Sequence, residues 1–273
     1  MRNLLFSIAI LSICLTANAE HILDLRHRKE IVKDTASMEI VYAHIPIDPV
    51  KNERRVKYEM LTIGNNFNKY GGYDNYQIDS LYMENPEFDP PFEEYRELSR
   101  NYETISESTL TNKTEGTITF HGKEFINYYR YTEPLPAIEW ELSDESDEII
   151  GYKCRKATAK WRGHDWTAWY SDIPEDAGPW KFQGLPGLIL KLEDSTGEHF
   201  FEAIGTKNDV FPFGYGKKLY CKTTREKFNN LYKEYCQNSG AMLVDSGMVI
   251  PRSEEEELML RSKKLFFAPI ELE

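Results

Sequence analysis

Two neighbouring stretches of the chain decide its fold: IIGYKCRKATAKWRGHDWTAWYSD at residues 149–172 and LILKLEDSTGEHFFEAIGT at residues 188–206. Each contains two runs of aromatic, β-branched and alternating apolar residues, and a short polar turn separates the two runs. The turns are Arg162-Gly163-His164-Asp165 and Asp194-Ser195-Thr196-Gly197. Because strands joined by such short turns pair antiparallel, these stretches predict a four-stranded antiparallel meander.

Weaker strand signals extend this sheet toward the N-terminus. The β pattern begins at Met38, covers residues 38–47 and returns at residues 54–64, where apolar and polar residues alternate. Residues 116–134 predict two further strands around His121-Gly122-Lys123. We therefore expect a mainly β protein with one large antiparallel sheet.

The segments beside these strands predict turns and short helices. Residues 68–77 are rich in glycine and polar residues and predict a turn, and the acidic run at residues 143–148 predicts an exposed hairpin tip. Residues 92–101 predict a short helix. Residues 20–37 are charged and of mixed periodicity, which predicts either a short helix or a loosely attached arm.

Two helices are expected near the C-terminus, at the periphery of the sheet. Thr223-Thr224-Arg225-Glu226 has the spacing of a capping box. Ser253 precedes four glutamates, and the end of that segment carries basic residues, so the charges match the helix dipole at both ends. Residues 265–273 are apolar enough to predict an edge strand packed on the sheet.

The N-terminus predicts a secretory signal peptide at residues 1–19. Arg2 precedes an apolar stretch that ends at Leu15, and Ala17-Asn18-Ala19 is an A-x-A cleavage site. A transmembrane helix needs about 20 apolar residues, and neither this stretch nor any later one is long enough. We expect cleavage near Ala19, release into the periplasm or onto the cell surface, an N-terminal arm at residues 20–37 and a single β-rich domain at residues 38–273.

Charge and cysteine content limit the partners and the covalent links. The formal net charge of −12 repels a nucleic-acid backbone and disfavours anionic membrane surfaces. The mature chain keeps Cys154, Cys221 and Cys236, and three thiols cannot all pair internally. The sequence leaves open a Cys221–Cys236 disulfide, a disulfide from Cys154 to either of them, or a buried Cys154 thiol.

The segment GPWKFQGLPGLIL at residues 178–190 links the two hairpins. Leu185-Pro186-Gly187-Leu188 predicts a type II turn with a positive φ at Gly187, so Gly184, Pro186 and Gly187 shape a chain reversal. In an extended segment, Trp180 and Phe182 would lie on the same side. These aromatic residues either fill the hydrophobic core or line an apolar groove.

The neighbouring strand carries tryptophans of opposite parity, so bulky groups lie on both of its faces. One face packs in the core, and the other needs a helix, a partner or a ligand against it. The candidate ligand-binding residues are Trp166, Trp169, Tyr170, Trp180, Phe182, Leu185 and Leu188.

Motifs of catalysis and cofactor binding are absent from the sequence. It contains no GxSxG elbow, no GxxxxGK[ST] loop and no HExxH helix. Residues 213–218 (FGYGKK) come nearest to GxGxxG but lack the βαβ context. No catalytic residue is assigned, and no cofactor or metal is expected. His164, Asp165 and His199 could assemble a metal site in space, but plain turn polarity is the preferred explanation of these residues.

Residues 150–190 resemble the GLPGLI family of exported cell-envelope proteins of Bacteroidota-type bacteria. The naming hexapeptide is unbroken at residues 184–189, and AWYSDIP at 168–174 and GPWKF at 178–182 also fit. This resemblance carries over no catalytic residues. The aromatic hairpins also look like the sheet of lipoprotein-carrier half-barrels such as LolA, which implies a curved, half-barrel-like meander whose concave face and C-terminal helices enclose an apolar cavity.

These features favour a non-catalytic binding or carrier protein of the cell envelope that holds an apolar ligand or a lipid. The alternative is a docking module that binds an outer-membrane or other envelope protein through an edge strand and exposed aromatic residues. A hydrolase or metalloprotein is a third alternative, which requires a stoichiometric metal or a turnover that depends on His164.

Overall fold

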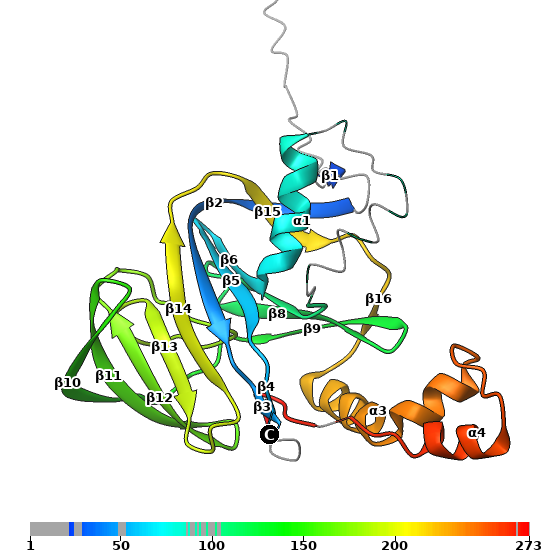
Figure 1. Ribbon diagram of the computed structural model, residues 1–273. Helices are drawn as coiled ribbons and strands as arrows, with labels where there is room; N and C mark the ends of the chain where they lie inside the picture. The colour runs from blue at the N-terminus through cyan, green and yellow to red at the C-terminus, as the bar shows by residue number, and fades with distance from the viewer. Residues whose placement is uncertain are drawn as a thin grey trace, which may run out of the picture.

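The computed structural model describes residues 22–24, 29–48, 53–85, 87, 91, 93, 97, 102, 105–265 and 267–272. The described chain forms a 14-stranded sheet (Figure 1). Its main path runs in the order β10 (Glu141–Ile149), β11 (Tyr152–Trp161), β12 (His164–Ser171), β13 (Ile189–Asp194), β14 (Phe200–Lys207), β2 (Lys29–His44), β5 (Lys57–Gly64), β6 (Phe67–Gly72), β7 (Ser108–Asn112), β8 (Thr117–Glu124), β9 (Asn127–Pro134) and β16 (Tyr220–Lys222). Neighbours pair antiparallel except β16, which lies parallel to β9. The expected mainly β fold is confirmed.

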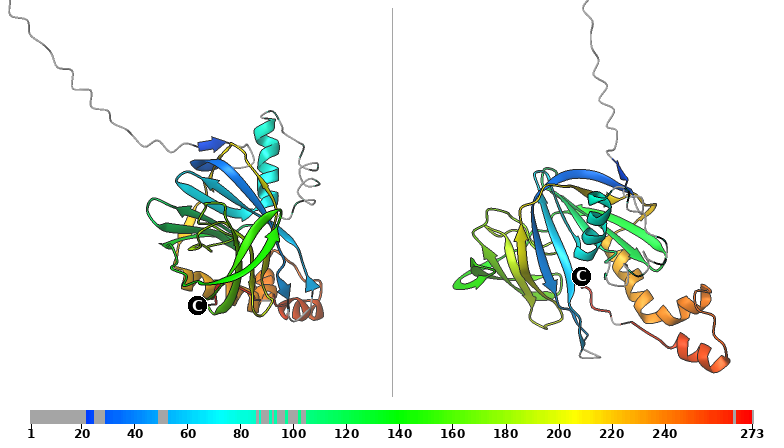
Figure 2. Two further views of the ribbon diagram at one scale, coloured as in Figure 1. Left: turned by 90° about the vertical axis from the view of Figure 1, so that its left-hand side faces the viewer. Right: turned by 45° about the horizontal axis from the view of Figure 1, so that its top comes forward.

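The long strand β2 produces the curvature of the sheet. Its C-terminal part pairs with β14 and β5, whereas its N-terminal part pairs with β1 (Ile22–Asp24) and β15 (Pro212–Gly216). The β2–β5 register shifts between Ala36 and Met38, and such bulges increase bend and twist. Figure 2 shows the resulting half-barrel-like shape from two sides. A separate ribbon pairs β3 (Ile47–Asp48) with β4 (Glu53–Arg54).

The central meander has the predicted pairing. Trp161 faces His164 across the β11–β12 turn, whose two residues, Arg162 and Gly163, have φ of 52° and 86°. Two positive φ values define the hairpin turn that matches strand twist. The turn is therefore shorter than predicted, and His164 is already the first residue of β12.

The hydrophobic core lies against β11–β14 and the adjoining part of β2. Trp166 is 1% exposed and packs its ring 4.6 Å from that of Phe182, which also contacts Trp161 at 4.7 Å. The buried hydroxyl of Tyr42 donates to the carbonyl of Ile189 at 2.6 Å. These contacts join β2, β12 and the segment before β13 into one packed unit.

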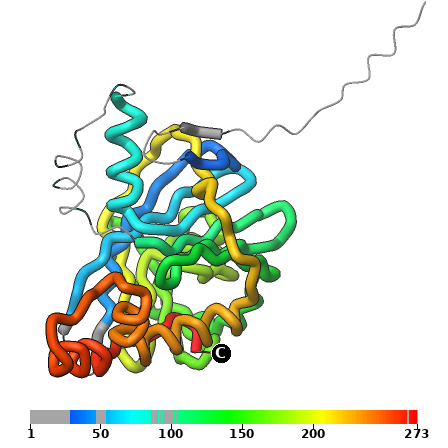
Figure 3. The backbone as a smooth tube through the Cα atoms, turned by 90° about the vertical axis from the view of Figure 1, so that its right-hand side faces the viewer, coloured from blue at the N-terminus to red at the C-terminus, as the bar shows by residue number. Residues whose placement is uncertain are grey.

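Helices lie at both ends of the concave side of the sheet. α1 (Tyr73–Glu84) lies beside β5 and β6, while α3 (Arg225–Asp245) and α4 (Glu254–Arg261) project from the opposite end (Figures 1 and 3). Thr224 and Ser253 cap the N-termini of α3 and α4 by accepting backbone N–H bonds. Both expected C-terminal helices are thus confirmed, including their start sites.

The linking segment before β13 differs from the expected turn. Gly184, not Gly187, has the positive φ, at 90°. Gly187 is required for another reason: a Cβ there would lie 1.9 Å from the carbonyl oxygen of Ser171. Trp180 has φ of 57°, so the segment is turned rather than extended. The intervening Lys181 is consequently only 2% exposed.

Several local expectations were wrong. Residues 68–77 contain the end of β6 and the start of α1 instead of a turn, and the acidic run at 143–148 lies within β10. The hairpin tip is Ile150-Gly151, which has positive φ at both residues. The described residues of 265–272 form no strand. Their backbone bonds go elsewhere, as when the Leu272 N–H donates to Arg162.

The strand expected from Met38 begins earlier, at Lys29, so residues 29–37 are neither helix nor loose arm. The pair of strands at 116–134 is confirmed, but its turn lies at Phe125-Ile126 and His121 is inside β8. The signal peptide at 1–19 and most of the helix expected at 92–101 lie outside the described residues.

Cys154, Cys221 and Cys236 form no disulfide with one another in this structure; Cys154 and Cys236 are buried and Cys221 is exposed. Among the described residues, no helix is both long and apolar enough to cross a membrane.

Candidate functional site

A cavity of about 240 Å³ lies between α1 and the sheet. α1 contributes Tyr76 and Met83, and β15 contributes Phe213 and Tyr215. Further apolar and aromatic wall residues are Met60, Ile105, Tyr128, Phe211 and Tyr220. An apolar cavity of about 150 Å³ binds benzene, so this one has room for a ligand of roughly ten non-hydrogen atoms. We refer to it as the α1 cavity.

A few polar groups interrupt the apolar wall of the α1 cavity. The ammonium of Lys69 lies 3.1 Å from Glu30, and the same Glu30 oxygen accepts the Gly214 N–H at 2.6 Å. Glu107 also lines the cavity, and burial raises the pKa of its carboxyl while the charge of Lys57 opposes that rise. The lining therefore combines apolar and aromatic walls with five charged side chains, since Asp79 and Lys218 also line the cavity; ligand pockets likewise place polar groups in a mainly apolar wall.

His121 is the least satisfied polar side chain in this wall. Both of its ring nitrogens are buried and have no hydrogen-bond partner. Its ring stacks on Tyr215 at 4.6 Å and meets the edge of Tyr220 at 5.2 Å. Burial, with additional repulsion from Arg130 and Lys69, lowers the pKa of His121 to about 3. The imidazole is thus neutral and held by aromatic packing.

A second cavity of about 130 Å³ lies farther along the concave face, toward α3. Its wall includes His44, Glu59 and Trp180, with Phe228 from α3. It shares three wall residues with the α1 cavity: Gly71, Ile105 and Glu107. A wider groove of about 580 Å³ is lined mainly by polar and charged side chains such as Lys33, Asn112, Glu115, Thr117, Thr119 and Thr132, so it suits an apolar ligand less well.

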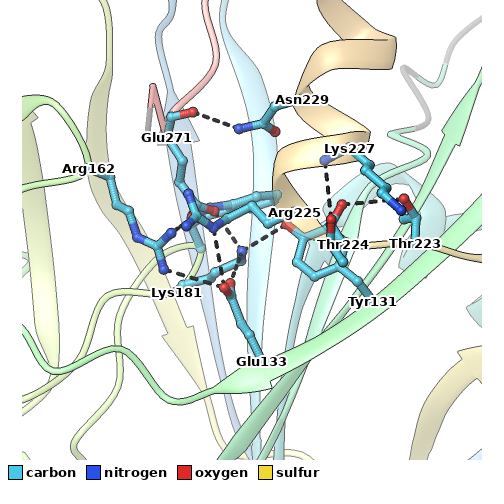
Figure 4. Close-up of polar contacts among 11 residues, drawn as sticks. Tyr131, Glu133, Arg162, Lys181, Thr223, Thr224, Arg225, Lys227, Asn229 and Glu271 are labelled. Carbon is cyan, nitrogen blue, oxygen red and sulfur yellow. Dashed lines mark hydrogen bonds and ion pairs between the residues drawn. The ribbon is translucent and has the colours of Figure 1, made fainter.

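A buried ionic cluster closes the concave face beside the second cavity (Figure 4). The ammonium of Lys181 lies 2.6 Å from Glu271 and 2.7 Å from Glu133, and it donates to the hydroxyl of Tyr131 at 3.0 Å. Burial alone would lower the pKa of Lys181, but the charges of Glu271 and Glu133 more than offset this and raise it. Lys181 is therefore a fixed cation.

Two arginines complete the cluster. Arg162 and Arg225 lie 3.4 and 3.3 Å from Glu133, and both also approach Glu271 at 3.7 Å. The indole N–H of the residue before Lys181 donates to Glu271 at 2.9 Å. The cluster thus joins β9, the β11–β12 turn, the start of α3 and the C-terminal segment. Every charged side chain of the cluster has at least one partner of opposite charge within it, which indicates that the cluster holds these four segments together.

The structure gathers the seven sequence-predicted ligand residues into the main hydrophobic cluster. Trp166, Tyr170, Phe182, Leu185 and Leu188 are buried in it, and Trp169 and Trp180 are partly buried against it. Only Trp180 among the seven lines either of the two concave cavities. Ligand binding by this set stays a prediction, while the walls of the α1 cavity were not anticipated.

The residues weighed for a metal site are only partly brought together. His164 and His199 lie close to each other with Glu198 as a third neighbour. Asp165 does not join them, because its side chain is 57% exposed and pairs with Lys160 at 3.4 Å. Adjacent residues of a strand point to opposite faces, which separates Asp165 from His164.

Comparisons with known proteins find a family match for a short segment of the sequence and structural similarity over most of the chain. A family model described as "Protein of unknown function (Porph_ging)", from a Bacteroidota-associated family, matches residues 161–191. No curated protein matches the chain.

Two crystal structures of PNGF-II, in space groups P21 and C2, match with TM-scores of 0.50 at 14% and 15% sequence identity. Each match covers 75% of this chain but only 34% of PNGF-II, so the chain spans about a third of that protein. At this identity the likeness concerns the fold alone.

Proposed function

We propose that this protein is a non-catalytic binding or carrier protein of the cell envelope that holds a small apolar ligand in the α1 cavity. The ligand has an aromatic or branched aliphatic body of roughly ten non-hydrogen atoms, as the volume requires, or it is a larger lipid of which one such portion enters. The observation that carries the proposal is a preformed cavity of about 240 Å³ whose walls come from nine elements of the fold, including α1 and β15.

The polar groups of the cavity fit a ligand that also carries one polar end. Lys69 and Glu30 form a fixed ion pair at one wall, which can accept or donate a hydrogen bond without moving. The neutral His121 lies in the same wall. An apolar body with one hydroxyl or carboxyl group therefore matches the lining better than a fully charged or a fully apolar molecule.

The likeness of residues 150–190 to GLPGLI proteins supports an envelope location. The A-x-A site that ends at Ala19 supports export. An exported carrier has a reason to keep a hollow interior, since burial in that interior is what holds an apolar cargo in water.

The binding test uses 1-naphthol, a two-ring probe with one hydroxyl, and measures its affinity by calorimetry. Ser108 lies on β7 in the cavity wall, so Ser108→Trp fills the cavity. The matched control Ser143→Trp makes the same change on β10, in the other half of the sheet. We expect Ser108→Trp to abolish binding while Ser143→Trp retains it.

Equal affinity in both variants would overturn the α1 cavity as the binding site. If the unmodified protein does not bind 1-naphthol either, the alternative of a docking module is favoured. The specific observation behind that alternative is the exposure of apolar side chains on and around the projecting helices, namely Met248, Ile250, Leu258, Met259 and Leu265.

A further inference from the structure

Three metal-ligating side chains meet at one end of the packed half of the sheet, outside the α1 cavity. His164 is the first residue of β12, and Glu198 and His199 directly precede β14. β13 lies between these two strands. One ligand atom of each side chain lies within 4.8 Å of the other two. A tetrahedral zinc ion holds its ligand atoms about 3.4 Å apart, so small side-chain rotations bring the three into coordination range.

Each of the two histidines has a buried ring nitrogen that no side chain among the described residues binds. The Nε2 atoms of His164 and His199 are buried and have no hydrogen-bond partner. Leaving a buried polar atom unsatisfied is unfavourable, and a native structure keeps few such atoms without a reason. The remaining residue, Glu198, is only partly buried, so it offers a carboxylate and a route from solvent.

The second nitrogen of His164 is engaged by a carboxylate. Its Nδ1 lies 3.4 Å from Asp194, whose other oxygen accepts the backbone N–H of His199 at 2.7 Å. The hydroxyl of Thr196 also donates to Asp194. A carboxylate at Nδ1 favours the tautomer with the proton there, which leaves the Nε2 lone pair of His164 free for a cation.

A relay of three side chains has the same effect on His199. Tyr70 donates to Glu59, and Glu59 lies 3.3 Å from the Nδ1 of His44. The proton of His44 therefore belongs on Nδ1, and its Nε2 accepts from the Nδ1 of His199 at 3.4 Å. This order leaves the Nε2 of His199 as an unprotonated acceptor, a tautomer fixed by outer partners as in many metal sites.

We propose that His164, Glu198 and His199 bind a zinc ion, with Asp194 and the Glu59–His44 pair orienting the two imidazoles. Two imidazoles and one carboxylate form a donor set that suits zinc and leaves a fourth position for water. Asp194, Glu59 and Glu198 supply negative charge around the ion. The site is independent of the proposed apolar ligand, because none of its three ligands lines the α1 cavity.

One competing arrangement involves the C-terminal segment. The carbonyl of Pro269 lies near the His199 ring, and it would accept a hydrogen bond from Nε2 if that nitrogen carried the proton. In that tautomer the Nδ1 of His199 would accept from the Nε2 of His44 instead of donating to it. The Nδ1 of His44 would then carry no proton, and its lone pair would face the carboxylate of Glu59, which is unfavourable. The contacts of His44 with Glu59 therefore favour the His199 tautomer that has its proton on Nδ1 and can bind a metal. Zinc binding distinguishes this tautomer from the one with the proton on Nε2.

The test measures zinc in tag-free protein by elemental analysis, after chelator treatment and addition of one equivalent of zinc chloride. Glu198→Gln removes the partly exposed ligand with little risk to the fold. His164→Gln tests a buried ligand. Asp165→Asn is the matched control, since Asp165 neighbours His164 but points away. We expect one zinc per chain, at least about tenfold weaker binding in both ligand variants, and unchanged binding in Asp165→Asn.

X-ray absorption of the zinc-loaded, unmodified protein provides a second readout that does not depend on the folding of any variant. Two imidazole nitrogens and one carboxylate oxygen at about 2.0–2.2 Å are expected. The proposal is overturned if the unmodified protein binds no zinc, if Glu198→Gln binds as tightly as the unmodified protein, or if the spectrum lacks imidazole ligands. Ser108→Trp, which blocks the α1 cavity, leaves zinc binding unchanged, so failure of one proposal does not imply failure of the other.

Discussion

The two halves of the sheet differ in what they enclose. The half made by β10–β14 is filled: Trp166, Phe182 and Leu188 are buried in a continuous hydrophobic cluster. The half made by β5–β9, with β15 and α1 against it, keeps cavities lined by aromatic and polar side chains. Most of the aromatic and leucine residues that attract attention in the sequence pack in the filled half, and we propose the hollow half as the place that holds a ligand.

The largest expected effect tests the filled half. Trp166→Ala removes a ring that is 1% exposed and packs 4.6 Å from Phe182, and such truncations cost about 3 to 5 kcal/mol. Tyr76→Ala, in the wall of the α1 cavity, leaves space that is already partly open and costs about 1 to 2 kcal/mol. Urea denaturation measures both. Equal losses would contradict the division into a filled and a hollow half.

The ionic cluster that closes the concave face provides the second test. Lys181→Met leaves Glu133 with its longer contacts to the two arginines, and leaves Glu271 with such contacts and the indole of Trp180, so we expect a loss of about 3 kcal/mol. The control is Lys156→Met, which breaks a surface pair with Glu145 at 3.0 Å and should cost less than about 1 kcal/mol. If Lys181→Met lowers the free energy of unfolding no more than Lys156→Met does, the ionic cluster does not stabilise the fold.

The third test measures how the free energy of unfolding depends on pH through His121 in the wall of the α1 cavity. The pKa of His121 is about 3 in the folded chain and has an ordinary value of 6.5. Between these values the unfolded chain binds the extra proton, so stability falls as the pH decreases from 6.5 toward 3. One such group contributes at most about 1.4 kcal/mol per pH unit.

His121→Phe keeps the stacking on Tyr215 and removes the titration. We expect the free energy of unfolding of this variant to decline less steeply with acid than that of the unmodified protein, and the two curves to run parallel above pH 7. Parallel curves over the whole range would show that His121 is not held neutral.

The smallest expected effect separates the hairpin groove from the α1 cavity. Trp169 is partly buried, with the ammonium of Lys156 6.0 Å from its ring, so Trp169→Ala should cost about 1 kcal/mol. If the groove predicted from the sequence binds the ligand, Trp169→Ala should lower the free energy of ligand binding more than the free energy of unfolding. If the α1 cavity binds the ligand, the affinity of this variant for 1-naphthol should be unchanged. Calorimetry on Trp169→Ala therefore decides between the two binding sites.

The filled half was predictable because its signals are local. The hairpins at 149–172 and 188–206 carry strand periodicity and tight turns within a few residues of each other, and the capping residues Thr224 and Ser253 mark their helices directly. Even here the turn at Gly187 was misread, because a close approach to the backbone of Ser171 leaves no mark on the sequence other than the glycine itself.

The hollow half was not predictable, because its walls come from distant segments. Gly71-Gly72 indicated a turn, yet these residues end β6 and lead directly into α1, whose polar composition hides its helical periodicity. β15 was noticed only as an incomplete nucleotide-binding pattern at residues 213–218. Lys181 was overlooked because its burial depends on Glu271, 90 residues later in the chain.

The proposed zinc ligands show which part of such a site can be foreseen. His164 and His199 were recognised as turn-proximal histidines that could meet in space. Strand parity already separates Asp165 from His164, so the third ligand had to come from another residue. Only the three-dimensional structure identifies it as Glu198.

Native mass spectrometry of the protein purified from its own cell envelope tests the central claim most directly. The unmodified protein and Ser143→Trp are expected to carry a small molecule that denaturation releases, and Ser108→Trp is expected to carry none. A bare mass in all three proteins, or the same molecule retained by Ser108→Trp, would contradict a ligand site in the hollow half of the sheet.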